Sequence, residues 1–88
     1  YKQFMAYKQL TKLIREKIQR KETIETKVLN LYEASNPSFY YVYEILGDYY
    51  AAIQQTDTAI TYWQKALTMP IPKQAEKVRI QQKINKKQ

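Results

Sequence analysis

The sequence predicts an all-α protein in which antiparallel pairs of helices pack against one another. Apolar side chains recur every three or four residues through most of the 88 positions, which is the spacing of one helix face. Prolines separate these periodic segments, and Tyr40–Tyr43, a run with strand propensity, has no partner strand. We therefore expect five helices, with approximate bounds 3–20, 23–35, 38–54, 57–69 and 73–86.

The first two expected helices form one pair over residues 1–36. Five apolar residues share one face of the first helix: Phe4, Tyr7, Leu10, Ile14 and Ile18. In the second helix, Leu29 and Tyr32 occupy the apolar positions. Pro37 ends that helix, because the proline ring is incompatible with a helix interior.

The third and fourth helices form a second pair around Gly47, the only glycine in the chain. A glycine inside a helix costs about 1 kcal/mol relative to alanine, which is understandable if the missing side chain admits the neighbouring helix. We expect Ala59, across the turn, to face Gly47. Thr56 and Asp57 precede the fourth helix as N-cap residues, and Pro70 stops it.

The last expected helix, within residues 73–88, contains few apolar residues. They are Ala75, Val78, Ile80 and Ile84, so one side can cover the fourth helix while the other side is solvated. Arrays of stacked helix pairs need such a polar terminal helix, and we assign this segment as a capping helix.

Eight residues of the second pair follow a recognisable order: Tyr43, Leu46, Gly47, Tyr50, Ala59, Trp63, Ala66 and Pro70. This order resembles the tetratricopeptide repeat, a helix pair of about 34 residues. The match covers residues 37–72, with Tyr and Trp exchanged at two aromatic positions and the closing Pro one residue early. Residues 1–36 resemble a degenerate repeat in which Lys12-Leu13 replaces the Leu-Gly pair. The resemblance implies a single domain, stacked as a short right-handed superhelix that binds other proteins in a groove.

The composition removes several kinds of chemistry. The chain has no histidine and no cysteine, so the commonest general base, the commonest metal ligand and every thiolate are missing. A single glycine cannot build a glycine-rich phosphate loop. We therefore expect no enzymatic activity, no cofactor and no metal. No apolar run is long enough for a membrane span.

Charge is distributed unevenly along this basic chain, whose net charge is +7. Residues 1–27 and 70–88 each carry a net +5, while residues 28–69 carry −3. Solvated helix faces explain most of this charge. Nucleic-acid binding through the basic flanks is the third-ranked function, because no nucleic-acid motif accompanies them.

By the family pattern, the groove is lined by Tyr41, Glu44 and Asp48, with Tyr7 from the first pair. Glu44 and Asp48 lie one helical turn apart and share a face. An acidic groove beside tyrosines suits a basic or aromatic-rich peptide. It does not suit the acidic C-terminal carboxylate that one subclass of the family clamps with basic side chains. In the alternative, another part of the same protein fills this face.

The resemblance therefore implies a non-enzymatic protein-interaction or scaffolding module. A second interpretation is an accessory C-terminal helical tail that packs on the catalytic domain of a larger enzyme, similar to tails of some bacterial hydrolases. Two repeats are few for a stable array, and the chain begins at Tyr1 rather than Met. Both observations lead us to expect a fragment of a larger protein, or a chain that self-associates.

Overall fold

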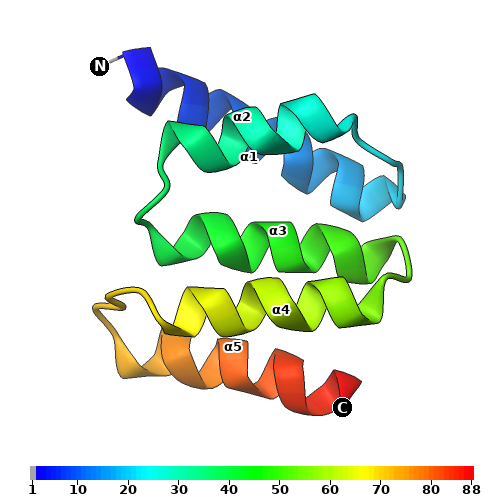
Figure 1. Ribbon diagram of the computed structural model, residues 1–88, viewed down its shortest axis with the longest axis vertical. Coiled ribbons are helices and arrows are strands. Elements are labelled where there is room, and N and C mark those ends of the chain that lie inside the picture. Colours follow the sequence, from blue (N-terminus) through cyan, green and yellow to red (C-terminus); the bar gives the residue numbers. More distant parts are fainter. Residues whose placement is uncertain (1) are drawn as a thin grey trace.

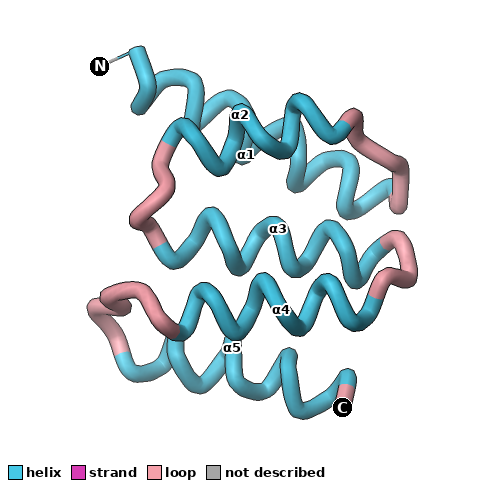
Figure 2. Tube along the Cα trace, viewed as in Figure 1, coloured by secondary structure: helices cyan, strands magenta, loops and turns pink. Residues whose placement is uncertain are grey.

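The computed structural model describes residues 2–88, with side chains from Met5 onward. It contains five helices joined by short loops (Figures 1 and 2), and no strand occurs in this part of the chain. They are α1 (Lys2–Arg20), α2 (Thr26–Ser35), α3 (Tyr40–Ala52), α4 (Thr56–Leu67) and α5 (Gln74–Lys87). The all-α prediction is confirmed, and every boundary falls within three residues of the expected one. The molecule measures 35 × 29 × 17 Å, so it is about two helices thick.

Helix α3 is the centre of the core. It contacts α1, α2 and α4, and eight of its thirteen residues are buried. Six of the residues that match the repeat pattern are buried as expected: Tyr43, Leu46, Gly47, Ala59, Trp63 and Ala66. Tyr50 is only half-buried, and its ring stacks on Tyr62 with centroids 5.4 Å apart. The core therefore lies mainly in the second pair, where α3 and α4 run antiparallel (Figure 1).

Gly47 lies directly under the indole ring of Trp63. A Cβ atom at position 47 would lie 2.9 Å from Trp63 Cγ, and closer still to Cδ1 and Nε1. The predicted close approach of the two helices is confirmed, but the partner is different. We expected Ala59 to face the glycine, whereas the three atoms nearest to a Cβ at position 47 all belong to the side chain of Trp63. Ala59 is fully buried elsewhere in the core.

The first helix of each pair ends in the same turn. Lys21 and Gln54 both adopt the left-handed conformation, with φ of 55° and 68°. In each turn this residue donates its N–H to the carbonyl three residues back, and the next residue donates to the carbonyl five residues back. These two bonds define the Schellman motif. The motif therefore recurs with a spacing of 33 residues, although no glycine marks either copy.

The start of α4 differs from expectation. The N-cap position is Gln55, and no side chain caps the helix. Thr56 and Asp57, predicted as caps, instead form the first turn of the helix. Asp57 still places a negative charge near the positive end of the helix dipole.

Tyrosine hydroxyl groups tie the loops to the core. Tyr49 accepts a hydrogen bond from the backbone N–H of Ile24 at 2.9 Å, which fixes the loop between α1 and α2. The Tyr43 hydroxyl donates to the carbonyl of Pro37 at 2.6 Å, which fixes the loop before α3. Buried phenols need such partners, and both of these tyrosines find one in a loop backbone group.

Candidate functional site

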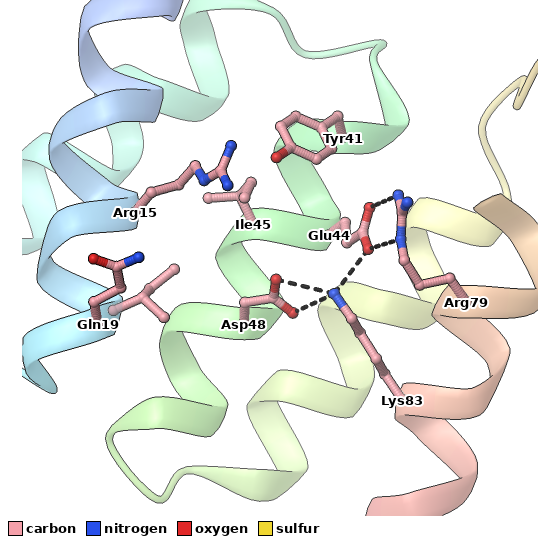
Figure 3. Close-up of a pocket in the computed structure, with 9 residues that line it drawn as sticks. Arg15, Gln19, Tyr41, Glu44, Ile45, Asp48, Arg79 and Lys83 are labelled. Atoms are coloured by element: carbon pink, nitrogen blue, oxygen red, sulfur yellow. Dashed lines mark hydrogen bonds and ion pairs between the residues drawn. The ribbon is translucent and has the colours of Figure 1, made fainter.

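A pocket of about 320 Å³ lies on the face formed by α1, α3 and α5. These are the alternate helices of the stack, and α2 and α4 contribute nothing to the lining. Figure 3 shows Arg15 and Gln19 projecting from α1 on one side, and Arg79 and Lys83 from α5 on the other. The complete lining is Arg15, Ile18, Gln19, Tyr41, Glu44, Ile45, Asp48, Arg79 and Lys83.

Glu44 is a buried carboxylate held by two cations from α5. Its side chain is only 2% exposed. Arg79 binds it in a bidentate manner, with Nε 2.8 Å from Oε2 and Nη2 2.7 Å from Oε1. Lys83 Nζ adds a third bond to Oε2 at 2.8 Å. Both carboxylate oxygens of Glu44 are thus paired, in the planar two-point geometry that makes arginine–carboxylate pairs strong.

Asp48 lies one turn further along α3 and shares Lys83 with Glu44. Lys83 Nζ is 3.0 Å from both Asp48 oxygens. Trp63 Nε1 also donates to Asp48 Oδ1 at 3.1 Å and to the Glu44 carbonyl at 3.3 Å. Because the indole can reach these acceptors only across Gly47, the close packing of the core and the position of the acidic pair are coupled.

The two carboxylates have pKa values shifted in opposite directions. Burial alone would raise the pKa of Glu44, but hydrogen bonds from Arg79 and Lys83 outweigh it and lower the pKa. For Asp48, burial raises the pKa, and Lys83 only partly offsets this effect. The proximity of Glu44 raises the pKa of Asp48 further.

The structure brings three of the four predicted groove residues together. Tyr41, Glu44 and Asp48 line the pocket, whereas Tyr7 does not. The ring of Tyr7 stacks on Tyr32 at 5.7 Å and meets Phe39 edge-on at 5.9 Å, so Tyr7 is a packing residue between helices.

The expected open acidic surface is also different. Glu44 is buried and paired, and Arg79 and Lys83 of the chain's own last helix occupy the position foreseen for a basic partner. This arrangement agrees with the alternative in which another part of the same protein covers the acidic face.

Sequence reasoning missed the residues that α1 and α5 contribute. Arg79 and Lys83 have the same one-turn spacing as Glu44 and Asp48 with opposite charge, a match that the sequence contains. Arg15 is exposed at the pocket, and its side chain makes no hydrogen bond or ion pair with the side chains described from Met5 onward. With α5 in place, the lining carries three cationic and two anionic side chains.

Among the described residues, no three His, Cys, Asp or Glu side chains are grouped as metal ligands would be. Both carboxylates of the pocket are paired with cations of α5. No described helix has the length and apolar character needed to cross a membrane. Comparison of the chain with protein-family models, curated proteins and solved structures gives no match.

Proposed function

We propose that this chain is a non-enzymatic protein-interaction module of the tetratricopeptide type. The observation that carries the proposal is the pocket, because side chains of three alternate helices converge there while the intervening helices form the opposite layer. Two further features support the repeat assignment. One is the glycine beneath an indole ring in the second pair, and the other is the Schellman turn that recurs in both pairs.

The open part of the pocket favours recognition of a protein segment. Arg15 supplies five N–H donors, and Tyr41 is a half-exposed aromatic ring beside it (Figure 3). Arginine and tyrosine are the residue types that dominate protein interfaces energetically. We expect a partner segment to contact these two side chains.

The test is selection of peptides from a display library on the 88-residue chain, followed by affinity measurements. Selected peptides should bind Arg15→Glu and Tyr41→Ala variants at least tenfold more weakly, because these changes remove anchors at the centre of the site. A matched control is Arg20→Glu, the same charge change on the same helix but outside the pocket. Equal binding to all three variants, with unchanged thermal melting, would reject the proposal.

A second candidate function is an accessory helical tail that packs on another domain. The supporting observation is exposed apolar surface on the first pair, where Met5, Leu13 and Leu31 are between 40% and 61% exposed. This function predicts self-association of the isolated chain in light scattering, relieved by Leu13→Lys and Leu31→Lys. A monomeric chain at high concentration would contradict it.

A further inference from the structure

We propose that the acidic pair Glu44–Asp48 is a docking site for a basic amphipathic helix, filled in cis by α5 and open to a partner helix of the same pattern in trans. The inference rests on the proposed interaction function and names a partner class for it. It places the chain's last helix in the role of an internal ligand that a protein partner displaces.

The charges of α3 and α5 match in spacing as well as in sign. Glu44 and Asp48 are one turn apart on α3, and Arg79 and Lys83 are one turn apart on α5. Figure 3 shows the four side chains meeting as a ladder between the two helices. Five bonds of 2.7–3.0 Å connect them, so α5 presents the donors in the geometry that the two carboxylates accept.

Apolar groups complete the recognition pattern. Ile80 and Ile84 each follow one of the cations in the sequence, and both are buried where α5 packs against α4. Together they define the sequence pattern Arg-Ile-x-x-Lys-Ile on one side of a helix. Any helix that presents two cations and two aliphatic side chains at these positions fits the same surface.

The attachment of α5 differs from that of the inner helices. Only Ile80 and Ile84 are buried among its fourteen residues, whereas eight of the thirteen residues of α3 are buried. It packs against α4 and reaches the acidic pair on α3 through the side chains of Arg79 and Lys83. Terminal elements with little buried apolar surface open more readily than central ones.

Release of α5 would leave the acidic pair without counter-ions. Glu44 and Asp48 carry like charges on successive turns of α3, which is unfavourable in the absence of cations. The Gly47–Trp63 contact does not involve α5, so the acidic surface would remain built on an intact helix pair. The released state therefore selects a basic helix over an acidic or neutral one.

The test uses a fluorescent peptide of residues 73–88 and the full 88-residue chain. In the receiving chain, Arg79→Glu plus Lys83→Glu should repel its own α5 from the acidic pair. We expect the peptide to bind this variant at least tenfold more tightly than wild type. The matched control is Lys86→Glu plus Lys87→Glu, which changes the charge of α5 equally at exposed positions outside the pocket. The control should bind the peptide as weakly as wild type does.

Two further changes locate the binding. Adding Glu44→Gln and Asp48→Asn to the Arg79→Glu, Lys83→Glu chain should weaken peptide binding at least tenfold. A peptide with Arg79→Glu and Lys83→Glu should also bind at least tenfold more weakly. Equal affinity for all receiving chains, or binding indifferent to the acidic pair, would overturn the proposal.

A measurement on the wild-type chain covers the case in which the variant does not fold. With saturating isotopically heavy peptide, the chain's own α5 amides should exchange hydrogen at least threefold faster while α3 amides do not. Unchanged exchange of α5 would overturn displacement. If the wild-type chain forms a dimer with exchanged α5 helices, the site binds a second copy of the chain, and the proposal of a different protein as partner is overturned. If the 73–88 peptide neither binds nor displaces α5, but display-selected peptides still need Arg15 to bind, the docking-site proposal is rejected and the proposed interaction function is retained.

Discussion

The two helix pairs solve the same packing problem in different ways. In the second pair, Gly47 lets the indole of Trp63 lie against the backbone of α3. In the first pair, the position 33 residues earlier, which matches the spacing of the shared turns, holds Ile14, a fully buried residue. There α1 and α2 are joined by the Tyr7–Tyr32 ring stack and by the 2.8 Å hydrogen bond between Thr11 and Tyr32. A close backbone approach and a stack of aromatic rings can thus serve the same antiparallel arrangement.

The turn geometry is shared even where the packing is not. Both pairs use the Schellman motif after their first helix, with Lys21 and Gln54 as the left-handed residues. Equal turns with unequal packing indicate that the turn sets the direction of the second helix, while the residue at the crossing sets how closely the two helices approach. Contacts between α3 and α4 are accordingly more extensive than those between α1 and α2.

The largest effect should come from filling the crossing of the second pair. Gly47→Leu would place a side chain where Trp63 lies, and we expect a loss of about 3 kcal/mol, or a melting temperature lower by roughly 12–24 °C. The comparison change in the first pair is Leu13→Ala, next to Ile14, which is the residue equivalent to Gly47. It should cost about 1 kcal/mol or less, since Leu13 is partly solvated. Similar losses at both positions in thermal melting would break the comparison.

Removing the buried charge that anchors α5 should have the next largest effect. Glu44→Gln removes the negative charge and one of the two oxygens that accept the bidentate bond from Arg79, and we expect a loss of about 2 kcal/mol in chemical denaturation. Glu16→Gln removes the same charge from an exposed position on α1 and should change stability by less than about 0.5 kcal/mol. Equal effects would mean that the ladder between α3 and α5 contributes no stability.

A smaller gain should come from the two shared turns. Lys21→Gly and Gln54→Gly each place glycine at a left-handed position, where a side chain is unfavourable. We expect each to stabilise the chain by about 0.5–1 kcal/mol. Equal gains in melting temperature would show that the turns are equivalent. A loss at one position alone would show that its side chain has another role.

The smallest effect is a pH dependence with a predictable sign. Because the folded state raises the pKa of Asp48, this residue favours folding below its ordinary pKa near 3.8, and that contribution is lost as the pH rises through the raised value. Asp48→Asn should therefore melt at a higher temperature than wild type at pH 7, with a smaller difference at pH 3. The contribution of Glu44 to stability has the opposite pH dependence. Its lowered pKa favours folding above its ordinary pKa of 4.5, and this contribution is lost as the pH falls through the lowered value. A wild-type advantage at pH 7 would contradict the assignment for Asp48.

The helices and most of the core were predictable from local patterns. Spacing of apolar residues located all five helices, and Gly47 inside a helix indicated the close approach in the second pair. The partner of Gly47 was not predictable, because the sequence does not show which side chain of the fourth helix packs against the glycine.

The site was predicted less completely, since its contacts join residues far apart in the chain. Arg79 and Glu44 are 35 residues apart, and nothing local to either of them shows that α5 folds back over α3. The Schellman turns were also missed, because Lys21 and Gln54 stand where glycine would have signalled them. Tyr7 was misplaced because an aromatic residue on a helix can face either a groove or a neighbouring helix.

The position of Trp63 makes the second pair optically distinct. It is the only tryptophan of the chain and is buried at the contact of α3 and α4, whereas the tyrosines among the described residues lie in both pairs. Fluorescence excited at the long-wavelength edge of the absorption band, where tyrosine does not absorb, would report unfolding of the second pair alone. Circular dichroism would report unfolding of all five helices. Coincident melting curves from the two signals would identify the chain as one cooperative unit, and separated curves would resolve the two pairs without any label.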